Sequence, residues 1–197
     1  MMYQRIERTG FYYGFPVILM TTRDKERGTD NVTPLSSSWT LSDTIVIGIG
    51  RNNKGFQNLA EGADATFSVP DAGLYEKVKR IEKMTGAEEV TEIKKDLGYT
   101  YAADKFAVAG FTKLLGETVA TVRIAECPIQ IESVVETITE RDWFAVVVCR
   151  MTALLVSDAL LQDGRIDTQK WHPLIYKFKE YTTTGARLGL NFGFQES

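Results

Sequence analysis

The sequence predicts a mainly β fold, an antiparallel barrel with helices inserted at its rim. Three observations predict it. The first third of the chain is rich in strand-like segments of aromatic and β-branched residues, and the second half returns to long segments of the same kind. Between these regions, apolar residues recur at helical spacing. We find no internal repeat and no interdomain linker, so we expect residues 1–197 to form one domain.

Four segments of the first part of the chain carry the strand signal: 11–22, 31–41, 43–50 and 64–69. The third segment alternates most clearly, with isoleucines at 45, 47 and 49 on one face. On its other face the side chains shrink to Gly48 and Gly50. The aliphatic face predicts a core, and the glycine face lets another backbone or a flat ligand approach closely.

Helices are predicted between the strands. A short helix follows Asn53 as its N-cap and ends at Gly62, which suits a left-handed C-terminal position. Asp71 is placed to cap a helix that runs to about Met84, and apolar residues at 90, 93 and 97 repeat the helical spacing. We therefore expect a helical insertion at about 71–98, between strands of the same domain.

The second half is predicted to form strands at 117–126, 128–139 and 143–157. A polar turn at 140–142 joins the last two. Cys127 and Cys149 lie in these apolar stretches without redox spacing, so we expect reduced core thiols. The Thr- and Gly-rich tail, about 181–197, is predicted to form a C-terminal arm.

Composition excludes several classes of protein. With 44% hydrophobic and 25% charged residues, the chain has globular rather than disordered or collagen-like composition. Its 23 basic and 26 acidic residues give a net charge of −3, which argues against a nucleic acid or an anionic membrane as partner. Two cysteines and one histidine are too few for a Cys₄ or Cys₂His₂ zinc site in one chain, and we expect no metal site.

The expected location is the cytoplasm. The N-terminus has no apolar signal region with a small-residue cleavage site. The longest apolar runs, 15–20 and 143–149, fall far short of the roughly 20 residues that a membrane helix needs.

Glycine-rich nucleotide motifs are not matched by the segment that follows the third strand. Gly48-Ile49-Gly50 lacks the third glycine of a dinucleotide fingerprint, and Gly55 is followed by Phe56 rather than by the Lys-Ser/Thr of a phosphate-binding loop. Arg51 and Lys54, however, flank two asparagines where a helix is predicted to begin. Cationic side chains and free backbone N–H groups together make a phosphate cradle, and the alternative is a solvated strand-to-helix turn.

Two further motifs have both a functional and an ordinary interpretation. Ser36, Ser37 and Ser38 offer hydroxyls and amides to the edge of a heterocycle, or form an exposed polar edge strand. His172, with Pro173, marks a turn or lies beside a ligand. With no second histidine and no Gly-x-Ser-x-Gly motif, a Ser-His-Asp hydrolase is poorly supported, and we expect no catalytic side chain.

Taken in order, several segments resemble the flavin reductase-like family, whose fold is an FMN-binding split β-barrel. They are FPVILMTT (15–22), NVTPLSSSW (31–39), IVIGIGRNNK (45–54) and DATFSVP (64–70), followed by KFAVAGFT (105–112), AECP (125–128) and HPLIY (172–176). The resemblance covers most of the chain. One departure lies at 42–44, where this chain has Ser-Asp-Thr and relatives often have Asp-Pro-Pro.

The resemblance implies a homodimer with one FMN near the subunit interface in each half, and it implies roles for twelve residues. The segment lining the isoalloxazine ring and ribityl chain corresponds to Thr33, Pro34, Ser36, Ser37, Ser38 and Trp39. The phosphate side corresponds to Arg51, Asn52, Asn53 and Lys54, and the pocket is closed at His172 and Tyr176.

The function implied by the resemblance is that of an FMN-dependent oxidoreductase. NADH or NADPH passes hydride to the bound flavin, and the electrons go on to a small-molecule acceptor or a partner oxygenase. One alternative is an FMN carrier or sensor without turnover, because the family's Gly-x-x-x-His-like element near the nicotinamide has no clear counterpart here. Another is a barrel-shaped interaction protein that binds no flavin.

Overall fold

The framework of the protein is a seven-stranded antiparallel sheet, seen in a computed structural model that describes residues 1–7, 10–60, 62 and 64–189. The sheet contains β2 (Ile18–Arg23), β3 (Asp30–Leu35), β4 (Ser38–Leu41), β5 (Thr44–Gly50), β6 (Ala65–Val69), β11 (Ile129–Glu140) and β12 (Phe144–Val156). Its strand order is β3-β2-β6-β11-β12-β5-β4, so β3 and β4 are the two edges. The predicted fold class, a mainly β antiparallel barrel with inserted helices, is confirmed.

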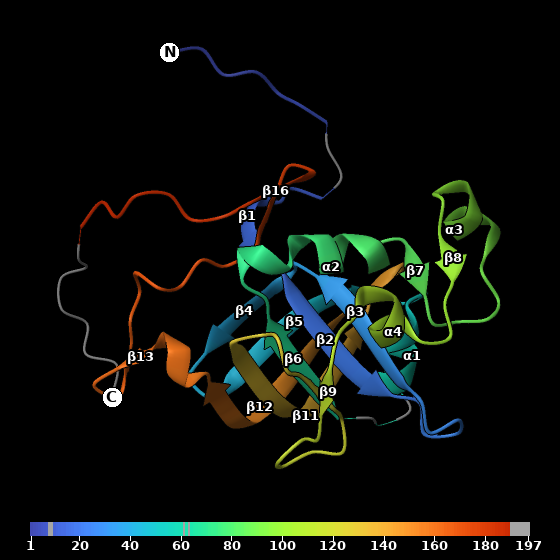
Figure 1. The fold of residues 1–197 in the computed structure, drawn as a ribbon. Coiled ribbons are helices and arrows are strands. Elements are labelled where there is room, and N and C mark those ends of the chain that lie inside the picture. The colour runs from blue at the N-terminus through green and yellow to red at the C-terminus, as the bar shows by residue number, and fades with distance from the viewer. Residues whose placement is uncertain (8–9, 61, 63, 190–197) are drawn as a thin grey trace.

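Short helices and strand pairs occupy the region between the barrel strands. They are α1 (Lys54–Ala60), a 3₁₀ turn (Ala72–Leu74), α2 (Tyr75–Ile81), β7 (Met84–Thr85), α3 (Glu92–Asp96), β8 (Thr100–Tyr101) and α4 (Lys105–Ala109). Figure 1 shows α2 lying across one end of the barrel, and α3 and β8 projecting to its side. Asp71 is a cap, as predicted, since its carboxylate accepts a hydrogen bond of 2.8 Å from the N–H of Gly73. The predicted helix from Asp71 to about Met84 is a 3₁₀ turn followed by α2, which ends at Ile81.

Small sheets complete the structure. The N-terminal β1 (Tyr13–Pro16) pairs with β15 (Ile175–Lys177), which pairs with β16 (Glu180–Thr182). The remaining elements are β9 (Lys113–Leu114), β10 (Arg123–Ile124), a 3₁₀ turn (Asp158–Leu160), β13 (Leu161–Gln162) and β14 (Arg165–Ile166). Of the expected C-terminal arm, residues 190–197 lie outside the described residues. None of the helices in the described part of the chain has the length and apolar character needed to span a bilayer.

Two apolar clusters lie on opposite faces of the sheet. The inner cluster contains the predicted isoleucines at 45, 47 and 49, together with Phe56 and Leu59 of α1. The other cluster lies under α2 and α4 and includes Leu19, Val32 and Phe106. Because adjacent residues of a strand point to opposite faces, β2 supplies Ile18 to the first cluster and Leu19 to the second. The two cysteines, at 127 and 149, are free thiols buried in these clusters, as predicted.

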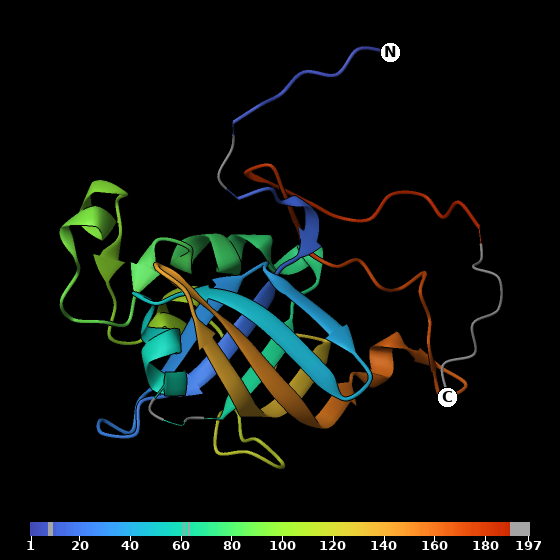
Figure 2. The same cartoon turned by 180° about the vertical axis from the view of Figure 1, so that it is seen from behind.

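The predicted strand 31–41 is in fact two strands. β3 ends at Leu35, opposite Ile18, and β4 begins at Ser38, opposite Ile47. Ser36 and Ser37 therefore carry the chain from one edge of the sheet to the other, and β3 and β4 do not pair. Figure 2 shows the resulting barrel from the side of β5, β11 and β12.

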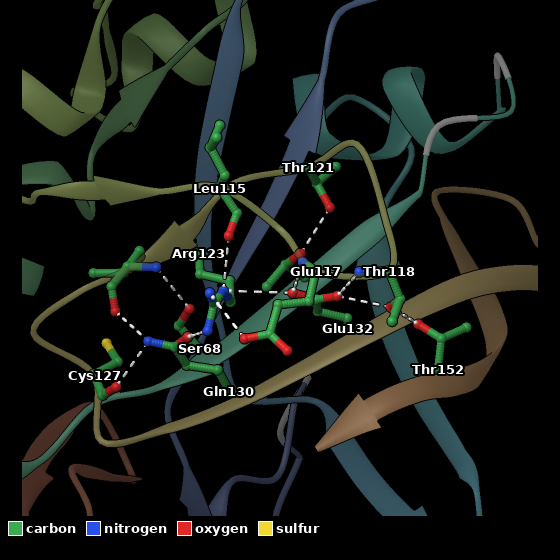
Figure 3. Close-up of polar contacts among 12 residues, drawn as sticks. Ser68, Leu115, Glu117, Thr118, Thr121, Arg123, Cys127, Gln130, Glu132 and Thr152 are labelled. Carbon is green, nitrogen blue, oxygen red and sulfur yellow. Dashed lines mark hydrogen bonds and ion pairs between the residues drawn. The ribbon is translucent and has the colours of Figure 1, made fainter. Parts of the chain in front are cut away.

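The predicted strand 117–126 is wrong over most of its length, because only Arg123–Ile124 is extended in a sheet. A buried carboxylate holds the preceding loop instead (Figure 3). Glu132, fully buried in β11, accepts hydrogen bonds from the N–H groups of Glu117 (2.8 Å) and Thr118 (2.6 Å) and from the Thr118 hydroxyl (2.7 Å). The guanidinium of Arg123 lies 3.4 Å from the same carboxylate. Local alternation cannot reveal a loop that is shaped by a partner distant in sequence.

Burial alone raises the pKa of Glu132, but the hydrogen bonds from Glu117 and Thr118 outweigh it and lower the pKa below its ordinary value. The charged form is therefore the one that stabilises the fold. This contribution is present at neutral pH and is lost as the pH falls through the lowered pKa.

Replacing this carboxylate is expected to destabilise the protein. In Glu132→Gln, one donor of the loop loses its acceptor and Arg123 loses its counter-charge, so the free energy of unfolding should fall by about 2 kcal/mol or more at pH 7. Urea unfolding at pH 7 measures this, and the gap to the wild type should narrow on acidification. The matched control is Glu136→Gln. Glu136 lies on the same strand as Glu132 but is exposed, and it pairs with Arg150. Its replacement should change stability by less than about 1 kcal/mol. Equal losses in the two variants would contradict the role given to Glu132.

Candidate functional site

A hollow of about 380 Å³ lies on the outer side of the sheet, between the N-terminal segment and strands β4, β5 and β12. Its volume lies in the range of small-molecule sites, about 300–1,000 Å³. We call it the aromatic hollow, and its lining consists of Gly10, Phe11, Tyr12, Phe15, Ser36, Ser37, Ser38, Trp39, Val46, Ile47, Gly48 and Val146. The hollow therefore places aromatic rings and hydroxyl groups beside β5, the strand that contains Gly48 and Gly50.

Ser37 is fixed in the wall of the hollow by two hydrogen bonds. Its hydroxyl lies 2.7 Å from the phenol oxygen of Tyr12, and its carbonyl accepts from the N–H of Gly48 at 2.8 Å. A Cβ on Gly48 would lie 3.3 Å from the Cβ of Ser37. The glycine therefore lets the serine segment lie close against β5, as the glycine face of this strand predicts.

Aromatic packing holds Tyr12 in place. Its ring contacts Tyr176 edge to face at a centroid distance of 5.4 Å, and it lies 6.0 Å from the ring of Phe15. Tyr176 is therefore one ring behind the hollow rather than in its lining. The turn after β15 supports the same segment, since the N–H of Phe178 donates to the carbonyl of Tyr12 at 2.8 Å.

The loop predicted to bind phosphate begins just after the part of β5 that lines the hollow. Gly48 pairs with Val146, both in the lining, and Gly50 pairs with Phe144 next to the loop. Arg51 is held against the β11–β12 turn, where its guanidinium lies 2.5 Å from Glu140 and donates to the carbonyls at 141 and 142.

Lys54 is paired rather than free. Its ammonium lies 2.8 Å from the carboxylate of Asp24 and is only 16% exposed. The hydrogen bond from Lys54 and the backbone N–H of Arg27 lower the pKa of Asp24. The ion pair ties the start of α1 to the β2–β3 turn.

Two lysines, of α3 and α4, lie in this region: Lys94 contacts the loop, and Lys105 lies close to Lys94. Lys94 of α3 donates to the carbonyl of Asn52 at 2.5 Å, and burial lowers its pKa. Lys105, the first residue of α4, is 4% exposed and makes no ion pair or hydrogen bond with the described residues. Burial, together with the charge of Lys94, lowers the pKa of Lys105 to about 7. A buried, unpaired ammonium beside a second one is a group that an anion would stabilise.

Two glycines let these parts approach one another. A Cβ on Gly55 would lie 2.7 Å from the Cε of Met20 and 2.8 Å from the hydroxyl of Thr33. A Cβ on Gly86, directly after β7, would lie 2.5 Å from Oδ1 of Asn31. That buried oxygen accepts no hydrogen bond from the residues that the structure describes, so it is free to accept one from a donor beside β3.

The structure brings together four of the twelve predicted residues in the aromatic hollow: Ser36, Ser37, Ser38 and Trp39. Thr33, under α1, and Pro34, paired with Leu19, lie in β3 outside this lining. Arg51, Asn52, Asn53 and Lys54 form the adjacent loop at the start of α1. His172 is exposed, its carbonyl accepts from the N–H of Ala72, and it does not line the hollow.

Sequence reasoning missed Tyr12, Asn31, Lys94 and Lys105. The aromatic run at 11–13 was a visible signal for the first of these. The two lysines carried no signal, because a solvated lysine and a buried one look alike in a sequence. Within the described residues, no group of three His, Cys, Asp or Glu side chains is placed to hold a metal ion.

Solved structures show which known proteins share this fold. Flavoredoxin of Desulfovibrio vulgaris (Miyazaki F) matches with a TM-score of 0.81 and 21% identity over 98% of this chain and 99% of its own. Flavoredoxin of Methanosarcina acetivorans gives 0.80 and 20% over 98% and 97%, and nitrilotriacetate monooxygenase component B of Bacillus cereus gives 0.73 and 17% over 90% and 88%. The protein is thus a split barrel of the kind found in flavoredoxins and flavin reductases, as the resemblance predicted.

A sequence comparison identifies the family within this class. The chain is 35% identical over 194 residues to the uncharacterized protein YdfE of Bacillus subtilis (strain 168), which covers 96% of this chain and 93% of YdfE. The chain belongs to the same family as YdfE. No family model matches the chain.

The buried amine of Lys105 leads to a stability prediction. Its pKa of about 7 lies below the ordinary value near 10.4, so unfolding takes up a proton between these pH values and wild-type stability should rise with pH across them. Lys105→Met should reduce this rise, leaving the smaller part that comes from Lys94, and should increase the free energy of unfolding at pH 6 by about 2 kcal/mol or more.

Urea unfolding of the protein without added ligand from pH 6 to pH 10 measures both effects. Lys95→Met, on the exposed surface of α3, is the control and should shift stability by less than about 1 kcal/mol at every pH. A Lys105→Met protein that is less stable than the wild type at pH 6 would refute the prediction.

Proposed function

We propose that this protein binds FMN and works as an NAD(P)H-dependent flavin oxidoreductase. The observation that supports it is the aromatic hollow, in which four aromatic side chains, three serines and the open face of Gly48 surround a space of about 380 Å³. A flat heterocycle with a polar edge needs such a combination of apolar faces and hydrogen-bonding groups. The donor set therefore fits an isoalloxazine ring.

Within this proposal, the side chains of the hollow bind and orient the ring. The hydroxyls and amides of residues 36–38 meet its polar edge, while Trp39 and the N-terminal aromatics cover its apolar parts. When bound, the flavin supplies the capacity to accept hydride from NADH or NADPH and to pass electrons on. No side chain of the chain needs to act as an acid or a nucleophile.

The phosphate is proposed to lie at the loop 51–54. Arg51 and Lys54 supply charge, Asn52 and Asn53 supply polar groups, and the lysines of the insertion add to the positive field. Tyr176 is proposed to support the hollow from behind, through its contact with Tyr12. Thr33, Pro34 and His172 are included in the proposal on the resemblance to the flavin reductase-like family.

A homodimer is proposed from the apolar outer face of the sheet. Trp39 is 57% exposed, Leu41 72% and Trp143 74%, and they flank the hollow on β4 and beside β5. An apolar face of this kind is usually covered by a partner, and a second copy would also cover the flavin. The acceptor is proposed to be a small molecule or a partner oxygenase, the latter in line with the name of the monooxygenase component B neighbour.

A second candidate function is an FMN carrier or sensor without turnover. It is favoured by the position of His172, which is exposed and outside the lining of the hollow. The two functions differ in whether the bound flavin is reduced when a nicotinamide nucleotide is added.

The first test is flavin binding and reduction in the whole protein. The wild type should hold FMN, seen as visible absorbance after gel filtration, and should bleach when NADH or NADPH is added without oxygen. Gly48→Val places a branched side chain against Ser37 and should weaken FMN binding about tenfold or more. Thr44→Val, on the same face of β5 but outside the hollow, is the control. Flavin that binds without bleaching would favour the carrier, and a colourless wild type would overturn the proposal.

The second test addresses the phosphate. Arg51→Ala and Lys54→Ala should each weaken FMN binding by about 1.5–3 kcal/mol and leave riboflavin binding nearly unchanged, because riboflavin has no phosphate. Asp24→Asn and Glu140→Gln are the controls, since they break the same ion pairs but keep the cations. Isothermal titration measures all these affinities. Equal losses for FMN and riboflavin would show that the loop does not hold the phosphate.

A further inference from the structure

A second cavity of about 380 Å³ lies on the other side of β4 from the aromatic hollow. Its floor is formed by buried isoleucines of the barrel interior, at positions 18, 45 and 131. Its walls are Trp39 on β4 and Trp171 and Ile175 in the segment that leads into β15. The two cavities share Ser38 and Trp39, so β4 is their common wall.

The cavity exists because the barrel is open at this point. β4 pairs only with β5 and does not continue the sheet to β3, so the ends of β2, β6 and β11 face the gap. The segment 171–175 lies across the gap but does not fill it. Backbone hydrogen bonds from Leu174 N–H to Pro70 (3.1 Å) and from Val17 N–H to the carbonyl of Leu174 (2.8 Å) hold this segment in place. The space is therefore built into the fold rather than left by a loose loop.

The chemistry of the lining selects one class of occupant. None of the described residues that line the cavity is charged, although a quarter of the chain is. Among these described lining residues, the side-chain hydroxyls are those of Ser38 and Thr40, and branched aliphatic side chains, prolines and two indoles make up most of the rest. A charged ligand would lose its hydration here without compensation, whereas an apolar ring would gain by leaving water.

We infer that this cavity is a second small-molecule site, one that takes an uncharged, largely hydrocarbon ring compound. The inference goes beyond the proposed function, because the cavity is separate from the hollow assigned to the flavin. The volume, the aliphatic floor and the flanking indoles suit a fused aromatic ring with at most one hydroxyl or carbonyl group near Ser38 and Thr40.

Two probes with the same ring framework test the charge requirement. N-phenyl-1-naphthylamine is uncharged, and 1-anilinonaphthalene-8-sulfonate differs from it by a sulfonate. Equilibrium dialysis of the full chain should show about one uncharged probe bound per chain, and about tenfold or more weaker binding of the sulfonate. Equal binding of both probes would overturn the inference, because it would indicate adhesion to exposed apolar surface.

Variants locate the bound probe. Val69→Trp fills the cavity from β6 and should abolish binding of the uncharged probe, whereas Leu154→Trp, on an exposed position of β12 outside the lining, should leave it unchanged. Ile175→Trp fills the cavity from the opposite wall and serves if Val69→Trp does not fold. Circular dichroism in the near ultraviolet checks that each variant is folded.

The outcome is distinguishable from failure of the proposed function. Gly48→Val narrows only the aromatic hollow, so the uncharged probe should still bind to this variant. In the wild type, FMN should not displace the probe. Loss of the probe in Gly48→Val, or displacement by FMN, would place the probe in the hollow and refute a second site. No binding, together with dissociation of a dimer by Val69→Trp, would show that a second copy of the chain covers the cavity instead.

Discussion

The position of the loop in the candidate site depends on a close contact made at a glycine. At Gly55 the backbone of α1 lies directly on β2 and β3, and any Cβ would collide with Met20 and Thr33. The helix is held in this place by the Lys54–Asp24 ion pair and by the amide of Asn58, which donates to Thr22 at 3.0 Å. Because α1 starts immediately after β5, this contact also sets where residues 51–54 lie relative to the hollow. A larger residue at 55 would move the helix and the loop together.

The two halves of the candidate site follow different physical rules. The hollow is formed by shape, because Gly48, the serine segment and the aromatic rings define a flat space with few charges. The loop next to it is governed by charge. Arg51 and Lys54 are paired with carboxylates, and the nearby Lys105 has no ion-pair partner among the described residues. An unpaired buried cation is costly for a fold to keep. A bound anionic group would offset this cost. Such a group would lie where the insertion meets the loop.

Alternation of side chains along the sequence predicted those elements whose structure depends on neighbouring residues alone. Alternation located the isoleucine face of β5, the long β11–β12 hairpin and the glycine face on which the hollow lies. The loop 117–122 was predicted as strand because its residues have strand propensity, and the carboxylate of Glu132 overrides that propensity from another strand. The break at Ser36 and Ser37 was missed for a similar reason, since it is set by which edge of the sheet each half of the segment joins. Lys105 needed the packing of the insertion on the barrel, which no single segment encodes.

The unpaired edges of the sheet connect these features. In most barrels the first and last strands pair and no edge remains. Here β3 and β4 do not pair, so Ser36 and Ser37 lie between the two strands and belong to neither. One strand, β4, has a cavity on each of its sides. An exposed edge strand with Trp39 and Leu41 on its surface is an aggregation hazard unless something covers it. A ligand in the hollow and a second copy over the outer face would both cover it. The gap between β3 and β4, which leaves the barrel open, therefore also provides a surface for binding.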